Sequence, residues 1–153
     1  MLVTINTDAS FIQGFAGYAF WMVCNEFKVL KAGVLRGKVK RPEIAEFKCV
    51  INALHILFKN DCKNVTKIII NTDCMNVIHC CQDNKAEIKK YGLNVKEFPE
   101  LTDMFKKIMK GKNIEVEFRH VKSHTGINDA RSYVNQWCDR EAKKHAIIRF
   151  NQN

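Results

Sequence analysis

The sequence predicts an α/β fold in which helices cover the faces of a mixed five-stranded sheet. Two observations predict it. Three segments with strand-like patterns come first, which is typical of an antiparallel meander. Two later strands alternate with helical segments, which is typical of a parallel extension of the same sheet. The length of 153 residues suits a single domain, 1–153.

The strand predictions follow from hydrophobic patterning. The first segment alternates apolar and polar residues and ends at Asp8. The break at Asn25-Glu26 predicts a hairpin between the second and third strands. Ile68-Ile69-Ile70 has the apolar run of a fully buried strand. The expected strands are therefore 2–8, 15–24, 27–35, 67–71 and 113–121.

The helix predictions follow from spacing and from stop signals. Pro42 opens a helix at the position where its missing N–H costs least. From Ile44 to Phe58, apolar residues recur every three or four positions and form one stripe. Gly111 ends a later helix. The expected helices are 42–58, 75–81, 99–110 and 130–146, and the lysine-rich segment 83–96 allows one more.

The charge and the cysteines restrict the class of protein. A net charge of +9 favours an anionic partner, either nucleic acid or a membrane surface, over a merely solubilising charge. No segment has the apolar length of a membrane span, and the N-terminus has the pattern of a strand and not of a signal peptide. Seven cysteines without a Cys-x-x-Cys pair argue against a zinc site or a disulfide-linked partner. They favour a reducing compartment, and we expect a cytoplasmic monomer.

Four acidic residues stand at informative places. Asp8 and Asp73 follow strands expected to be parallel neighbours, so both lie at the edge where such sheets place their sites. Glu46 adjoins the apolar helix stripe, and an acid on a buried face requires a partner such as a cation. Asp139 lies in the last helix. Each alone has an ordinary explanation: a helix cap, a solvated acid, or an ion pair of Asp139 with Lys143.

Taken together, the four acids have a chemical purpose. Mg²⁺ prefers hard oxygen ligands, and two such ions about 3.5–4 Å apart can clamp a scissile phosphate. The carboxylates repel one another without metal, so we expect the metal-free cluster to be strained.

Six segments of the chain resemble, in order, the motifs of type 1 ribonuclease H, and together they span nearly its whole length. Ala9 stands where the family's first motif has glycine. The segments are Thr7-Asp8-Ala9-Ser10, Ala16-Gly17-Tyr18-Ala19 with Trp21, Ala45-Glu46, Asn71-Thr72-Asp73, His120-Val121-Lys122-Ser123-His124-Thr125-Gly126, and Trp137-Cys138-Asp139-Arg140-Glu141-Ala142.

This resemblance implies a ribonuclease H-like fold and hydrolysis of the RNA strand of RNA–DNA hybrids, leaving 3′-hydroxyl and 5′-phosphate ends. It implies that Asp8, Glu46, Asp73 and Asp139 hold two Mg²⁺ ions, which Mn²⁺ can replace. His124 would lie on a loop beside the metals and assist proton transfer or product departure, work that suits the ordinary pKa of histidine.

The sequence also departs from the family. Pro42-Glu43 stands where an asparagine pair often reads the hybrid, and Cys74-Met75 replaces a Ser-Gln pair. In the family those pairs help to read the 2′-hydroxyl that distinguishes RNA from DNA. The sequence therefore predicts the cleavage reaction more directly than it predicts the preference for the RNA strand. Asn76 is a candidate substitute contact.

Basic residues are candidates for holding the duplex. Arg41 precedes the glutamate helix, and Lys85, Lys89 and Lys90 lie where many family members carry a basic segment beside an aromatic residue, here Tyr91. The alternative is a solvated face.

Two other functions remain open: a nuclease of this fold that cuts DNA, such as a junction resolvase or an integrase-like enzyme, and a binding module without catalysis. Trp21 and Trp137 are expected to be core residues.

Overall fold

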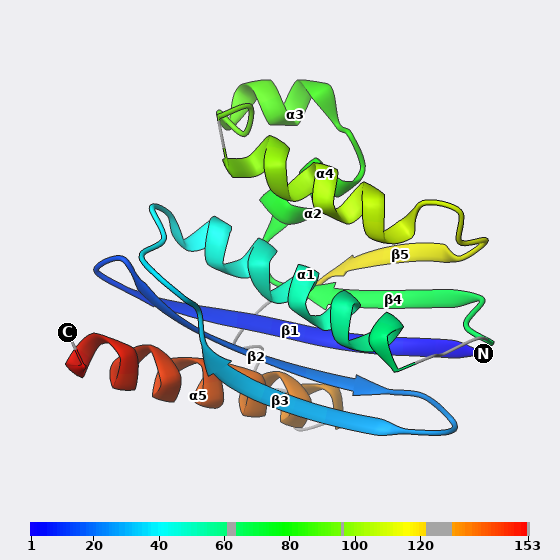
Figure 1. The fold of residues 1–153 in the computed structure, drawn as a ribbon, viewed down its shortest axis with the longest axis horizontal. Coiled ribbons are helices and arrows are strands. Elements are labelled where there is room, and N and C mark those ends of the chain that lie inside the picture. The colour runs from blue at the N-terminus through cyan, green and yellow to red at the C-terminus, as the bar shows by residue number, and fades with distance from the viewer. Residues whose placement is uncertain (61–63, 96, 122–129, 153) are drawn as a thin grey trace.

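Five strands form one mixed sheet with the order β3-β2-β1-β4-β5, and helices pack on it (Figure 1). A computed structural model describes residues 1–60, 64–95, 97–121 and 130–152. The strands are β1 (Leu2–Ile12), β2 (Phe15–Val23), β3 (Lys28–Val34), β4 (Lys67–Thr72) and β5 (Glu115–His120). The helices are α1 (Pro42–Lys59), α2 (Met75–Cys81), α3 (Lys85–Lys90), α4 (Glu97–Met109) and α5 (Ala130–Asn151). The predicted fold class is confirmed.

The first three strands form the expected antiparallel meander, but β1 is longer than predicted. It does not end at Asp8, because it continues to Ile12 by pairing with β2 alone after its last parallel pair with β4, Asn6 with Asn71. A tight turn joins the two strands. Gln13 and Gly14 both have positive φ, 47° and 92°, which matches the right-handed twist of a hairpin.

The last two strands extend the sheet in parallel, as predicted. β4 pairs with β1, and β5 pairs with β4 in the register of Ile70 with Phe118 and Thr72 with His120. Because β1 and β4 run in the same direction, residues just after their last pair lie at one edge of the sheet.

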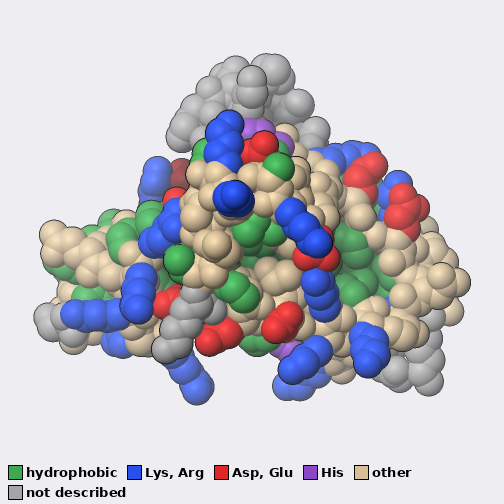
Figure 2. Space-filling view, turned by 90° about the horizontal axis from the view of Figure 1, so that it is seen from above, with side chains coloured by type: hydrophobic (Ala, Val, Ile, Leu, Met, Phe, Trp, Pro, Cys, Tyr) green, Lys and Arg blue, Asp and Glu red, His purple; other side chains and the backbone are tan. Residues whose placement is uncertain are grey.

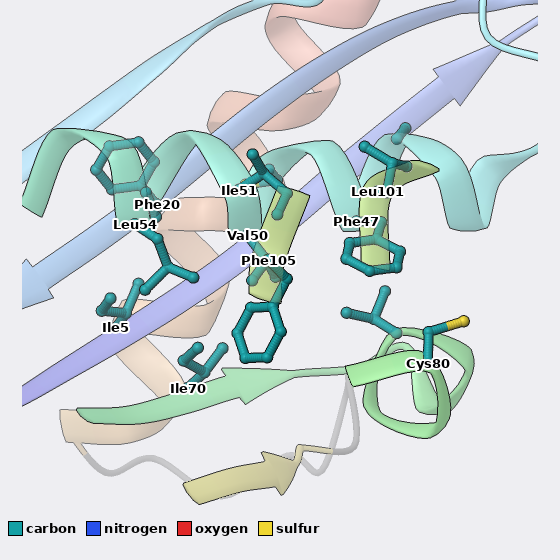
Figure 3. Close-up of a cluster of buried hydrophobic side chains, with 14 of the residues drawn as sticks. Ile5, Phe20, Phe47, Val50, Ile51, Leu54, Ile70, Cys80, Leu101 and Phe105 are labelled. Carbon is teal, nitrogen blue, oxygen red and sulfur yellow. The ribbon is translucent and has the colours of Figure 1, made fainter. Parts of the chain in front are cut away.

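The main core lies between the sheet and α1. Helix α1 packs against β1 and β2, and α4 packs against α1. Figure 3 shows side chains from these elements meeting, with Phe47, Val50 and Leu54 of α1 facing Ile5 of β1 and Ile70 of β4 across the core. All five side chains are at most 1% exposed. Burial of such side chains stabilises the fold by about 1.5–3 kcal/mol each, so this core fixes α1 on the sheet.

The opposite face of the sheet is covered by α5, which packs against β1, β2 and β3. The contact is unusually close at Gly17 of β2. A Cβ atom built there would lie 2.3 Å from the carbonyl oxygen of Ala142 and 2.4 Å from the amide nitrogen of Ala146. Glycine is therefore required at position 17 for α5 to reach the sheet.

Aromatic residues continue this second interface. The rings of Trp21 and Trp137 meet edge to face with centroids 5.6 Å apart, and Tyr133 meets Trp21 in the same way at 5.9 Å. Such pairs favour packing between β2 and α5. Both tryptophans were expected to be core residues; they are partly buried and pack against the small cluster of Ala19, Cys138 and Ala142.

Three helix predictions needed adjustment. The lysine-rich segment 83–96 contains the short helix α3, which Asn84 caps by accepting a hydrogen bond from the Glu87 amide. Helix α4 starts at Glu97, so Pro99 lies within its first turn, where amides need no partner inside the helix. Helix α5 continues beyond the predicted end at 146 to Asn151, because Phe150 packs against Phe15.

The described cysteines are all free thiols: Cys24, Cys49, Cys74, Cys80, Cys81 and Cys138. Across the described ranges, no helix combines the length and the apolar character that crossing a bilayer requires.

The close approach at Gly17 gives a testable prediction. Gly17→Ala should lower the free energy of unfolding by roughly 3 kcal/mol, since the new methyl group meets rigid helix backbone and α5 has to move. Urea denaturation of both proteins measures this difference. Gly33→Ala on β3 is the matched control, because its methyl group would lie 3.2 Å from the Tyr18 ring, which can shift. Equal stability losses in the two variants would contradict the proposed backbone contact.

Candidate active site

Three acidic side chains from separate parts of the sequence converge at the edge of the sheet where β4 ends. Asp8 lies on β1, Glu46 lies in α1, and Asp73 follows β4. One carboxylate oxygen from each lies within 4.8 Å of the other two. The structure therefore brings together three of the four predicted acids, which we call the acid triad.

The parallel register explains how Asp8 and Asp73 meet. Asn6 pairs with Asn71, so continuing both strands by two residues places Asp8 opposite Asp73. Glu46 reaches the same place from above, because the apolar residues on either side of it fix α1 on β1 and β2. The expectation that Glu46 faces the sheet agrees with its exposure of only 8%.

A single backbone amide orients two of the carboxylates. The Ala9 N–H donates to Asp8 Oδ1 at 2.9 Å and to Glu46 Oε1 at 3.1 Å. The last pair between β1 and β4 is Asn6 with Asn71, so the Ala9 amide is not used in hydrogen bonds between these two strands. The continuation of β1 past Asp8 thus positions a donor that the sequence pattern did not reveal.

The triad concentrates negative charge in a poorly hydrated place. Burial, together with the charges of Asp73 and Asp139, raises the pKa of Asp8 from 3.8 to about 7. Burial and the charges of Asp8 and Asp73 raise the pKa of Glu46 well above its ordinary value. The pKa of Asp73 is also raised, mainly by burial. These shifts have the direction expected for carboxylates that are buried together without a metal.

The predicted fourth acid, Asp139, lies near the acid triad but has a different partner. Its Oδ2 atom is 3.0 Å from Nζ of Lys143, one turn later in α5. Its charge still raises the pKa of both Asp8 and Asp73, so it contributes to the same negative potential. The ion pair with Lys143, one of the ordinary explanations offered by the sequence, is present alongside this proximity.

His120 is a neighbour that the sequence analysis left without a role. Its Nε2–H donates to the carbonyl oxygen of Asp73 at 3.1 Å, and its positive form lowers the pKa of Asp73. The signal for it was the parallel register, which pairs Thr72 with His120 and so places this ring beside Asp73.

Two buried thiols lie beneath the acids. Cys49 Sγ donates to the Ala19 carbonyl oxygen at 3.3 Å, and Cys138 Sγ lies 3.7 Å from the Asn6 carbonyl oxygen. Burial and the charge of Glu46 raise the pKa of Cys49 well above its ordinary value, and burial raises that of Cys138 to about 12. Both thiols therefore stay protonated, and the three converging ligand atoms found among the described residues are carboxylate oxygens.

This arrangement fits a hard divalent cation. Among the described residues, Glu46 Oε2 is buried and has no hydrogen-bond partner. A buried carboxylate oxygen of this kind carries a large desolvation cost unless a cation compensates it. Three convergent carboxylates supply the oxygen ligands that Mg²⁺ or Mn²⁺ prefers.

The remaining predicted residues lie before α1, in α2 and α3, or outside the described ranges. Arg41 precedes α1, where its Nε is 3.0 Å from Glu43 Oε2 and its guanidinium lies over the Phe98 ring. Asn76 lies on α2, partly buried. Three lysines of α3 are exposed: Lys85, Lys89 and Lys90. His124 falls within residues 122–129, which the structure does not describe.

An exposed aromatic residue accompanies the lysines of α3. Tyr91 is 47% exposed and stacks on His79 with centroids 6.1 Å apart and an interplanar angle of 4°. The Lys90 ammonium lies 5.3 Å from the centre of the Tyr91 ring. Cations and an aromatic face therefore lie together at α3 and the residue that follows it.

The raised pKa of Asp8 predicts how the stability of the metal-free protein depends on pH. Folded Asp8 takes up a proton near pH 7, whereas the unfolded chain does so near 3.8, so folding is favoured as the pH falls through this window. The free energy of unfolding in EDTA should rise by about 1 kcal/mol per pH unit on going from pH 7 to pH 5.

Asp8→Asn should raise stability at pH 7.5 and flatten this dependence, because it removes the charge that the triad repels. Urea denaturation across the pH range measures both effects. Asp103→Asn, on the exposed side of α4, is the control and should keep the wild-type slope. A wild-type slope in Asp8→Asn would contradict the strain assigned to this carboxylate.

Comparisons with known proteins agree with this geometry. A family model described as RNase H matches residues 2–147. No curated protein sequence matches the chain significantly.

Solved structures resemble the whole fold at low identity. The N-terminal RNase H domain of Rv2228c from Mycobacterium tuberculosis is 14% identical, with a TM-score of 0.73 over 99% of this chain and 97% of that one. RNase H1 from Halobacterium salinarum is 14% identical, with a TM-score of 0.69 over 97% and 99%. LC11-RNase H1, isolated from compost and solved with an RNA/DNA hybrid, is 17% identical, with a TM-score of 0.66 over 95% and 97%. At such identities these structures support the fold.

Proposed function

The chain belongs to the RNase H family, nucleases that hydrolyse the RNA strand of RNA–DNA hybrids, and we propose that it does so with two divalent cations held by its acidic residues. The observation that carries this proposal is the convergence of Asp8, Glu46 and Asp73 within 4.8 Å. Mg²⁺ is the proposed ion, and Mn²⁺ is expected to replace it because both prefer oxygen ligands.

The ligand assignments follow from position and charge. Asp8, Glu46 and Asp73 would hold the cations jointly, and Asp139 would complete the set from α5 after exchanging its Lys143 partner for a metal. When bound, paired cations lower the pKa of the attacking water and neutralise charge on the scissile phosphate. The Ala9 amide holds two of the carboxylates in place before any cation arrives.

The protein's other residues would bind the substrate and move protons. His124, by its match to the family motif, would assist proton transfer or product departure. Arg41, Asn76 and the α3 lysines Lys85, Lys89 and Lys90 would contact the duplex. In support, the α3 lysines are exposed and, within the described chain, form no ion pairs. We expect products with 3′-hydroxyl and 5′-phosphate ends, which end mapping of the cleaved strand would identify.

Strand discrimination remains a proposal of its own. Glu43, at the place of a base-reading amide, is engaged by Arg41, so it is oriented towards its own helix terminus. Cleavage of a hybrid, compared with duplex and branched DNA of the same sequence, separates the proposed activity from that of a DNA nuclease.

The free thiols fit a reducing environment, and we propose a cytoplasmic monomer.

The catalytic assignment predicts a large loss in one conservative variant. Asp73→Asn should lower cleavage of a labelled RNA–DNA hybrid in Mg²⁺ on the order of a thousandfold, since several kcal/mol of charge stabilisation depend on the cations that it would hold. Gel analysis of initial rates measures the loss, and circular dichroism shows whether the fold persists. Asp103→Asn serves again as the surface control. Undiminished turnover by Asp73→Asn would remove this acid from the mechanism.

A further inference from the structure

Two cations cover one aromatic ring at the tip of the β1–β2 hairpin. Phe15, the first residue of β2, is only 4% exposed. Lys38 Nζ lies 5.3 Å from the centre of its ring, and Arg149 Cζ of α5 lies 5.5 Å from the same point. Phe150 closes a third side edge to face at 6.4 Å. Three separate segments of the chain thus meet at this tip.

The two cations have no acidic partner among the residues that the structure describes. Neither Lys38 nor Arg149 forms an ion pair with a carboxylate in the described ranges. Both charges lie within 5.5 Å of one ring centre, well inside the roughly 10 Å over which salt screens charges. Arg36 and Lys40 are exposed beside Lys38 and have the same sign. Positive charge therefore accumulates here without an ion-pair partner in the described part of the chain, and an anion would relieve the repulsion.

The tip is well placed relative to the acid triad. Phe15 pairs with Ile12, four residues beyond Asp8 on β1. At about 3.3 Å per strand residue, the tip lies roughly 13 Å from Asp8. Figure 1 shows the hairpin tip and the C-terminal end of α5 at the same end of the molecule, and Figure 2 shows Lys and Arg side chains spread over the surface. A duplex lying across the triad can reach this point within a few nucleotides.

We propose that Lys38 and Arg149 form a phosphate-binding patch that grips the nucleic-acid duplex beyond the cleavage site. The Phe15 ring fixes both cations, so little side-chain freedom is lost when a phosphate binds. Arg149 lies beyond the matched family region, residues 2–147, in the last turn of α5. The proposal rests on the proposed function in taking the hybrid duplex as ligand.

The test measures binding of a labelled RNA–DNA hybrid by fluorescence anisotropy at several salt concentrations, with EDTA present to prevent cleavage. R149Q and K38Q should each weaken binding roughly threefold to tenfold and reduce the slope of log K against log salt by about 0.7–0.9, the loss of one phosphate contact. In the double variant the reduction of the slope should be about twice that of either single variant. R149K should retain the wild-type slope, because it keeps the charge.

K112Q is the matched control. Lys112 lies over the Phe58 ring at 4.7 Å, after α4 and away from the hairpin tip, so its loss removes the same kind of contact elsewhere. Slopes for R149Q and K38Q equal to that of K112Q would overturn the patch, as would an R149K variant as weak as R149Q. Lys38 is exposed, so K38Q decides the matter if R149Q fails to fold.

The outcomes also separate this inference from the proposed function. If the protein cleaves the hybrid but R149Q and K38Q keep the wild-type salt slope, the phosphate-binding patch is refuted and the proposed function stands. Reduced slopes in a chain that binds hybrid without cutting it would retain the patch and refute the hydrolysis.

Discussion

The burial of like-charged carboxylates in one place is the constraint on which the rest of this molecule depends. Asp8, Glu46 and Asp73 lie close together, and their burial, with repulsion from neighbouring acids added to it, raises the pKa of each. The core between α1 and the sheet supplies the compensating stability, because it fixes the elements that carry the acids. The site is thus prepared for a cation at the expense of the metal-free fold.

The two faces of the sheet divide the task of positioning. The α1 face carries the large apolar core and delivers Glu46, whereas the α5 face is thin and relies on backbone contact at Gly17 and on paired aromatic rings. Asp139 is therefore positioned by close packing of a helix on a strand. Asp139 forms an ion pair with Lys143, whereas the three acids of the triad form no ion pair with a lysine or arginine among the described side chains.

Much of this arrangement was predictable from the sequence, because each strand or helix has its own hydrophobic period. The parallel relation of β1 and β4 then placed Asp8 beside Asp73, and the apolar stripe of α1 turned Glu46 inward. The extension of β1 past Asp8 was not predictable, since its pattern gives no sign that β2 alone would hold it. Tertiary packing also decided the end of α5, and register across strands decided the contact of His120 with Asp73. The place of His124 lies outside the described residues, so its assignment still rests on the motif.

The amide of Ala9 is the donor that orients two carboxylates, yet it belongs to the main chain. Alanine scanning is blind to it, and so is any survey of amino-acid variation, because every residue except proline supplies the same group. Part of what defines this centre is thus encoded as chain geometry and not as side-chain identity. Only a change to the backbone itself, such as replacing this amide with an ester, would measure how much the Ala9 N–H contributes to positioning the two carboxylates.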